Sequence, residues 1–85
     1  MWNILVGRDD GVAVRNRLKW WRHELRIDRQ KDFANFLGVT PQQLSLWETQ
    51  QQQPNLETLI KLWKKLRTKI PYINLQDLIE DDSPE

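Results

Sequence analysis

The chain has 85 residues with 13 bases, 12 acids, one histidine and no cysteine. This length provides one domain with one small core, and the missing cysteines exclude disulfides and thiolate metal sites. His23 alone is too little for an imidazole metal site, no apolar run reaches the roughly 20 residues that cross a bilayer, and the N-terminus does not resemble a signal peptide. We therefore expect a cytoplasmic protein without a metal, cofactor or membrane span.

Charge is distributed unevenly along the sequence. The last six residues, EDDSPE, contain four acids and no base, and without them 13 bases face 8 acids. Seven of the bases lie within residues 15–31, namely Arg15, Arg17, Lys19, Arg22, Arg26, Arg29 and Lys31. Such a basic segment suits a polyanionic partner. The alternative is a solvated helix face, and charge alone favours neither.

The first part of the chain predicts an arm followed by a helix. Residues 1–6 (MWNILV) are short and apolar and end at a glycine, which suits a strand or a packing arm, and the segment RDDG favours a turn. From about residue 12 to residue 26, apolar side chains recur at steps of four, three and four, which is one stripe of an amphipathic helix. The stripe consists of Val14, Leu18, Trp21 and Leu25.

Two short helices with a tight turn between them are predicted next. Asp28 caps the first of these helices, at about residues 29–37, and Gly38 can adopt the left-handed conformation that ends a helix. Thr40 then caps and Pro41 starts the other helix, which runs to about residue 49.

The rest of the chain predicts a fourth helix at about residues 55–68 and a fifth at about residues 75–80. The glutamines before the fourth helix, residues 50–53, indicate a solvated loop. The expected fold is therefore all-α with five helices. The domain covers residues 12–80, residues 1–11 form an N-terminal arm, and residues 81–85 form an acidic disordered tail.

The second and third helices have the pattern of a helix-turn-helix. Ala34 is small enough for close helix approach, Gly38 allows the turn, and Leu44 with Trp47 pins the following helix. With DFANFLGV, LSLWE, PNLETLIKLWKKL and INLQDLIE in this order, residues 14–80 resemble the Cro and lambda-repressor helix-turn-helix family. The chain departs from the family where TQQQQ replaces a common glycine after Trp47-Glu48, and LRIDRQ has one residue more than the usual link.

The resemblance implies that the helix at about residues 41–49 enters the major groove of double-stranded DNA. On a helical wheel Leu44 and Trp47 face inward, and Gln43 lies on a flank. The outward residues that we expect to read bases are Gln42, Ser45 and Leu46. A glutamine can form two hydrogen bonds with adenine, and a leucine can contact a thymine methyl group. For Leu46, packing against a neighbouring element is an equal alternative.

The resemblance also implies contacts outside the base edges. The residues expected at DNA phosphates are Arg29, Gln30, Lys31, Thr40, Gln43 and Asn55. For Asn55, capping the fourth helix is the simpler role. Arg22 and Glu48 are expected to form a structural ion pair that holds the third helix on the first.

The expected function is that of a small DNA-binding transcriptional regulator, a repressor, associated with the nucleoid. The alternative is a protein-interaction module, such as an antitoxin or co-regulator, that uses the same fold. Neither a nucleophile paired with His23 nor a phosphate-binding glycine loop is visible, so we expect no enzyme and no small-molecule ligand. Family members commonly dimerise on two half-sites. The segments expected to form this interface, or to cover the core of a monomer, contain Trp2, Ile4, Tyr72 and Ile73.

Overall fold

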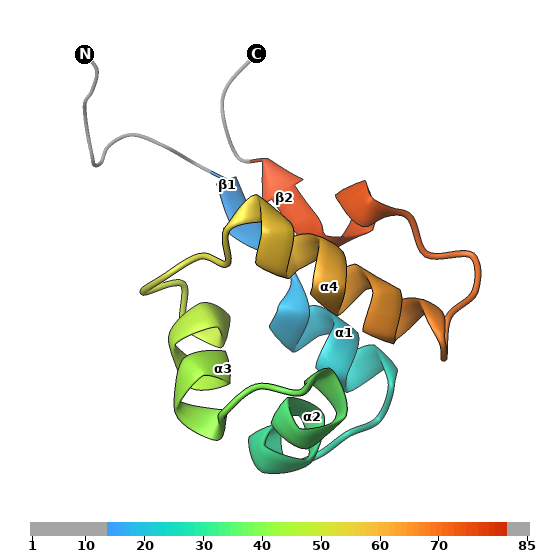
Figure 1. The fold of residues 1–85 in the computed structure, drawn as a ribbon. Coiled ribbons are helices and arrows are strands. Elements are labelled where there is room, and N and C mark those ends of the chain that lie inside the picture. Colours follow the sequence, from blue (N-terminus) through green and yellow to red (C-terminus); the bar gives the residue numbers. More distant parts are fainter. Residues whose placement is uncertain (1–13, 82–85) are drawn as a thin grey trace, which may run out of the picture.

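The structure is a computed structural model that describes residues 14–81 (Figure 1). The N-terminal arm predicted at residues 1–11, including Trp2 and Ile4, lies outside this range, as do residues 82–85. The elements in chain order are β1 (Val14–Asn16), α1 (Leu18–Glu24), α2 (Gln30–Leu37), α3 (Pro41–Glu48), α4 (Leu56–Arg67), the 3₁₀ helix η1 (Leu75–Leu78) and β2 (Ile79–Asp81). The three helices predicted in the middle of the chain are confirmed to within about one residue at each end.

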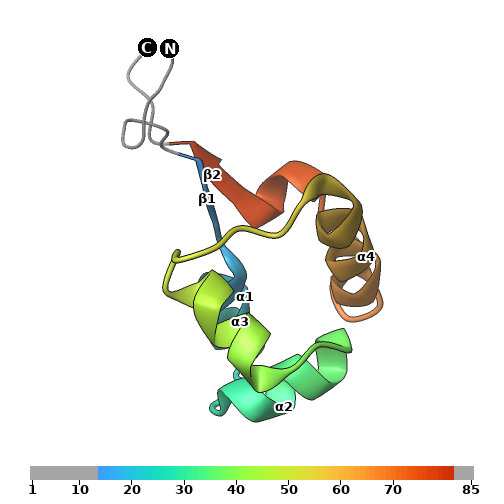
Figure 2. The same cartoon turned by 60° about the vertical axis from the view of Figure 1, so that its left-hand side comes forward.

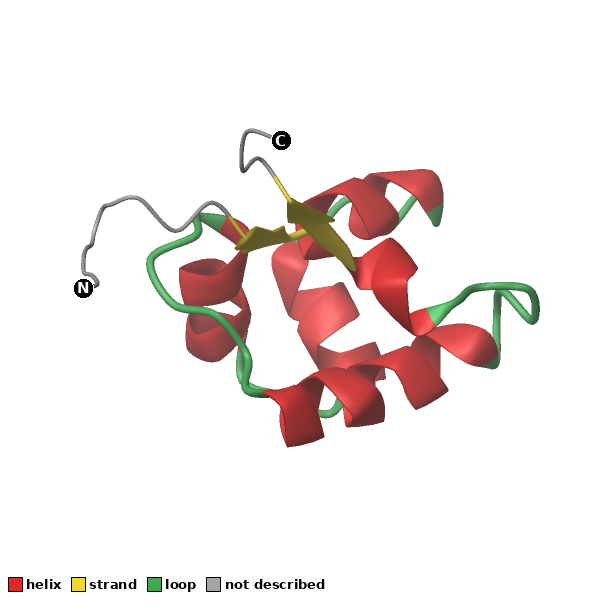
Figure 3. Ribbon diagram, turned by 90° about the horizontal axis from the view of Figure 1, so that it is seen from above, coloured by secondary structure: helices red, strands yellow, loops and turns green. Residues whose placement is uncertain are grey.

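Two short strands join the ends of the described chain. β1 and β2 are antiparallel, with Val14 opposite Asp81 and Asn16 opposite Ile79. The backbone N–H of Arg17 donates to the carbonyl of Leu78 at 2.8 Å, which continues the pairing towards α1. Figures 1 and 2 show β1 and β2 side by side, and Figure 3 shows the two strands in yellow among the red helices.

The sheet corrects the predicted start of the first helix. Residues expected in a helix from residue 12 onward are extended at β1, and α1 begins only at Leu18. Val14 lies four residues before Leu18, so its position also fits a helical stripe, and a single sequence cannot separate the two cases. The pairing with β2 decides the conformation, because it joins the backbone of residues 14–16 to residues far along the chain.

The sheet also corrects the predicted fifth helix and the tail. The segment INLQDLIE forms only the 3₁₀ turn η1 before it becomes β2, so residues 14–81 contain four α-helices and a two-stranded sheet rather than five helices. Asn74 and Asp77 form a reciprocal capping box around η1. Asp81, expected to begin the disordered tail, belongs to β2 and pairs with Val14. Residues 79–81 are extended because they complete the sheet with β1.

The hydrophobic core lies between the four α-helices, with α4 across from α2 and α3 (Figure 2). Its largest fully buried side chains are Phe33, Leu18, Leu44, Leu62, Leu66 and Leu78. Ile73, which we expected at a dimer interface, is buried in this core, whereas the neighbouring Tyr72 is 81% exposed. No helix within residues 14–81 is long and apolar enough to cross a membrane.

Candidate nucleic-acid interface

A tight turn sets the angle between α2 and α3. Gly38 has φ of +80°, and the N–H groups of Gly38 and Val39 both donate to the carbonyl of Ala34, at 2.9 and 3.0 Å. A left-handed residue at this position ends a helix and closes its last turn. Ala34 is fully buried, so α3 can approach α2 closely. The turn and the small residue act together, as the sequence predicts.

α3 begins with a side-chain cap, and its buried and exposed side chains lie on different faces. The Thr40 hydroxyl oxygen accepts a hydrogen bond from the Gln43 N–H at 3.1 Å. Leu44 and Trp47 are buried, Gln42 is exposed, and Ser45 and Leu46 are partly exposed. The three side chains expected to read bases therefore lie on the solvent side of α3. Partial burial of Leu46 is compatible with packing and with contact to a ligand.

Arg22 and Glu48, paired by the family resemblance, contact each other in the structure. Arg22 Nε donates to Glu48 Oε2 at 2.8 Å, and Arg22 Nη2 donates to Glu48 Oε1 at 3.0 Å. The side chains are 8% and 1% exposed. Arg22 Nη1 also donates to the carbonyls of Ile27 and Asp28, in the link that has one extra residue. The pair therefore joins α1, the link before α2, and the end of α3.

The partly exposed Gln30 joins this buried pair. Its Nε2 donates to Glu48 Oε1 at 3.0 Å, so the residue expected at a phosphate also orients the carboxylate of Glu48. A glutamine amide carries two N–H hydrogens and one carbonyl oxygen. One hydrogen and the oxygen are thus left for a ligand after the bond to Glu48.

A second polar cluster holds β1 against the C-terminal end of α3. Asn16 is 4% exposed, and its Nδ2 donates to the carbonyl of Trp47 at 2.7 Å. The Gln50 amide pairs with the Asn16 backbone, with Asn16 N–H to Gln50 Oε1 at 3.2 Å and Gln50 Nε2 to the Asn16 carbonyl at 3.0 Å. Gln53 Oε1 also accepts from Asn16 Nδ2, at 2.9 Å. Part of the glutamine run is therefore structural.

Sequence analysis did not identify this cluster, although one signal was present. The family often has a glycine soon after the Trp47-Glu48 pair, and Gln50, two residues after this pair, has φ of +64°, a conformation that favours glycine. The hydrogen bonds between Gln50 and Asn16 offset the backbone strain of this residue. A glutamine in place of a turn glycine can therefore point to a side chain that has a bonding role.

The expected phosphate-contacting residues lie mostly at helix ends. α2 has no side-chain cap at its N-terminus, so its first N–H groups are available to an anion. α4 is capped by Asn55, whose Oδ1 accepts from the Thr58 N–H at 2.8 Å, which leaves the Nδ2 hydrogens. Thr40 keeps its hydroxyl hydrogen after capping α3. Gln43 Nε2 donates to Gln52 Oε1 at 3.3 Å and retains a second hydrogen.

This face contains many amides and few charges. α3 has no basic residue, and its one acid, Glu48, is paired. At the start of α2, Arg29 and Lys31 are exposed, and Arg29 forms an exposed ion pair with Asp32 at 3.4 Å. The seven bases of residues 15–31 therefore do not all serve one face.

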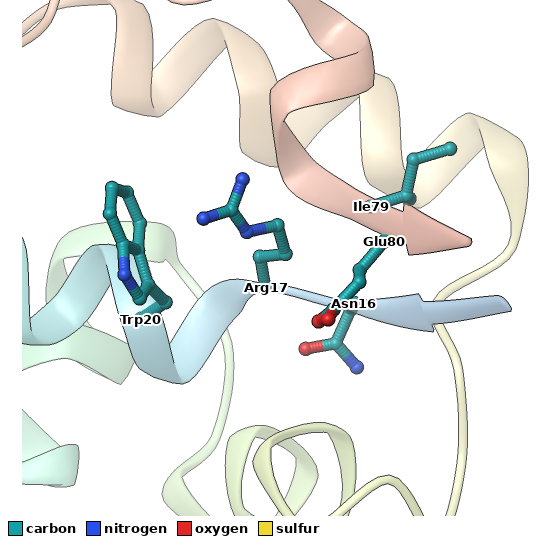
Figure 4. Close-up of a pocket in the computed structure, with 5 residues that line it drawn as sticks. All are labelled: Asn16, Arg17, Trp20, Ile79 and Glu80. Carbon is teal, nitrogen blue, oxygen red and sulfur yellow. The ribbon is translucent and has the colours of Figure 1, made fainter. Parts of the chain in front are cut away.

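Arg22 and Arg17 of this basic segment have contacts inside the domain. Arg22 is buried with Glu48. Arg17 lies over the ring of Trp20 at 4.3 Å, and Figure 4 shows its guanidinium group extending beside that ring, in a pocket that Ile79 and Glu80 of β2 also line. The basic segment is thus partly structural. By contrast, Lys61, Lys64 and Lys65 of α4 gather beside Gly38, a feature that the sequence analysis did not single out.

Four helices, a glycine turn and an outward-facing third helix define a helix-turn-helix protein, the class that binds DNA through the second helix of the unit. A family model described as helix-turn-helix matches residues 18–73. The chain belongs to this family, the Cro/C1-type helix-turn-helix proteins of bacterial and phage regulators. No curated protein and no solved structure matches the chain. The family is a DNA-binding one and typically non-enzymatic.

Proposed function

We propose that this protein represses transcription by sequence-specific binding of double-stranded DNA, with α3 in the major groove. The observation that carries the proposal is the division of α3. Leu44 and Trp47 anchor its inner face, and Gln42, Ser45 and Leu46 remain on the other. A helix anchored in this way presents its outward side chains in a constant geometry, which base reading requires.

The base contacts are assigned by chemistry. Gln42, exposed in the first turn of α3, pairs its amide with the N6 and N7 atoms of adenine. Ser45 donates to or accepts from a neighbouring base. The Leu46 side chain contacts a thymine methyl group at the less exposed edge of the same face.

Neutral donors supply most of the phosphate contacts. The uncapped N-terminus of α2 and the remaining hydrogens of Gln30, Thr40 and Asn55 all suit phosphate oxygens. We also assign Gln43 to a DNA phosphate. Lys31 and Arg29 add positive charge to this set of contacts. Neutral contacts orient the protein and release few counterions, so the predicted affinity depends only moderately on salt.

We further propose that the protein represses transcription as a homodimer. One small domain makes few DNA contacts, and a two-fold dimer doubles them on two half-sites. The structure describes two of the residues expected at the interface. Tyr72 is 81% exposed and accessible to a partner, whereas Ile73 is buried. Occupation of a promoter by such a dimer blocks access of the polymerase.

Two observations favour a second candidate, a module that docks a protein partner. The face of α3 has few charges, and Trp20 and Tyr72 are exposed, at 44% and 81%. Aromatic side chains are enriched at the centres of protein interfaces. An antitoxin or co-regulator built on this fold would use these aromatic residues and leave the amides of α3 in water.

Selection of bound duplexes from a random pool tests the DNA proposal. We expect an enriched half-site that contains adenine, repeated with two-fold symmetry, and gel shifts that weaken as salt increases. The variant Leu44→Asp, which removes the inner anchor of α3, serves as a negative control. Absence of an enriched sequence, together with no duplex binding at low salt, would overturn DNA reading and leave the protein-docking candidate.

A further inference from the structure

An apolar groove of about 360 Å³ lies between the two-stranded sheet and the N-terminal end of α4. We call it the sheet–α4 groove, and its apolar walls are Val14, Ile79, Pro54, Leu56 and Leu59. Val14, Leu56 and Ile79 are 44, 66 and 38% exposed, and they are three of the five large hydrophobic side chains that are exposed within residues 14–81. Their convergence at one place is typical of a surface that something covers.

The chain enters the described structure at one wall of this groove. Residue 13 joins Val14, so the first 13 residues of the chain are tethered at the groove itself. Their sequence begins with MWNILV, which is apolar, and continues with GRDDG, a turn sequence. An apolar segment is thus attached by a short linker beside an apolar groove.

The second edge of β1 provides a place for this segment. Among the described residues β1 pairs with β2 alone. At Asn16 the other edge is occupied by the Gln50 amide, which accepts from the N–H and donates to the carbonyl as a third strand would. Residues two apart in a strand direct their backbone groups to the same edge. Val14 therefore presents its N–H and carbonyl on the edge that Gln50 satisfies at Asn16.

We propose that residues 1–6 of the same chain cover the sheet–α4 groove, with the backbone of Ile4 paired to Val14 on the part of the β1 edge that Gln50 leaves open. In an extended segment Trp2, Ile4 and Val6 share one face, and Asn3 lies on the other. The five residues GRDDG between Val6 and Val12 have a length that is common for hairpin loops. A hairpin with this loop brings Ile4 opposite Val14, at the wall of the groove.

The size of the groove and the tether favour the same chain over a second copy. Stable interfaces between proteins use about 20–30 residues on each side, far more than the walls of this groove provide. A short linker holds its segment at an effective concentration of roughly millimolar. Trp2 and Ile4 then complete the fold of their own chain, which leaves Tyr72 for a dimer contact.

Disulfide trapping in the full chain tests this proposal, because the chain contains no cysteine. In the double variant Ile4→Cys, Leu56→Cys the two thiols reduce oxidised glutathione and form an intramolecular disulfide. The matched control is Asn3→Cys with Leu56→Cys, which moves one thiol to the opposite face. We expect the first pair to form its disulfide with an effective concentration at least about tenfold above that of the control, which reports the tether alone.

Three outcomes would overturn the proposal. Equal effective concentrations for the two pairs would show a tethered but undocked segment. Disulfide-linked dimers in a mixture of the single variants Ile4→Cys and Leu56→Cys would assign the groove to a second copy. In a cysteine-free cycle with Ile4→Ser and Leu56→Ser, additive decreases in the melting temperature would show that the two side chains do not interact.

Discussion

Arg22 of α1 and Glu48 of α3 form a buried bidentate ion pair, with N–O distances of 2.8 and 3.0 Å. Removing the arginine alone leaves a carboxylate that is almost completely buried, with Gln30 as its remaining donor. We expect Arg22→Met to lower the free energy of unfolding by about 3–5 kcal/mol. Urea denaturation measures this loss.

Two further variants separate the pair from general effects on α1. Lys19→Met changes an exposed base of the same helix and should alter stability by less than about 0.5 kcal/mol. The double variant Arg22→Met, Glu48→Met removes the unpaired charge, so it should be more stable than Arg22→Met. A double variant that is the least stable of all would contradict the role assigned to the charge.

Gln50 combines a left-handed backbone with hydrogen bonds to Asn16. Both Gln50→Ala and Gln50→Gly lose those bonds, but only alanine retains the strain of a side chain at φ of +64°. We expect the glycine variant to be more stable than the alanine variant by about 1 kcal/mol, and less stable than the parent protein. Thermal and urea unfolding of the three proteins give this order.

Gln51 provides the control for Gln50, since it is exposed and is not among the residues with positive φ. At Gln51 the alanine variant should be at least as stable as the glycine variant, because glycine adds freedom to the unfolded chain. The same order at both positions would show that backbone strain at Gln50 does not decide its stability.

Gln42 and Gln43 are neighbours with different expected roles. Gln42 is exposed, whereas the Gln43 amide already contacts Gln52. We expect Gln42→Ala to cost about 1–3 kcal/mol in discrimination at one base pair of the selected site. Gln43→Ala should weaken binding to all sites by a similar factor. Competition with singly substituted duplexes measures both effects, and uniform weakening by Gln42→Ala would disprove base reading.

Lys31 is the exposed lysine beside the uncapped start of α2. If it contacts one phosphate, Lys31→Gln should reduce the slope of log K against log salt by about one. Lys64→Gln is the matched control. It removes an equal charge, but from α4, where Lys64 lies near Gly38 and away from the start of α2. A slope unchanged by Lys31→Gln but reduced by Lys64→Gln would move the DNA-contacting face towards α4.

The helix-turn-helix could be predicted from the sequence. Its signals are local: Gly38 for the turn, Thr40 and Pro41 for the start of α3, and the inward spacing of Leu44 and Trp47. Each signal involves residues within about one helical turn of each other. Capping residues and hydrophobic periodicity in the sequence therefore predict these features without knowledge of the fold. The same spacing, with the family resemblance, indicated which side of α3 faces solvent.

The extended conformation of β1 and β2 and the role of the glutamine loop could not be predicted from the sequence, because both depend on tertiary contacts. Val14 and Ile79 fit helical patterns, but each lies in a strand because β1 and β2, far apart in sequence, satisfy each other's backbone groups. The structural role of Gln50 likewise rests on its hydrogen bonds to Asn16, 34 residues away. Such hydrogen bonds depend on how the helices bring distant segments together, which local propensity does not contain.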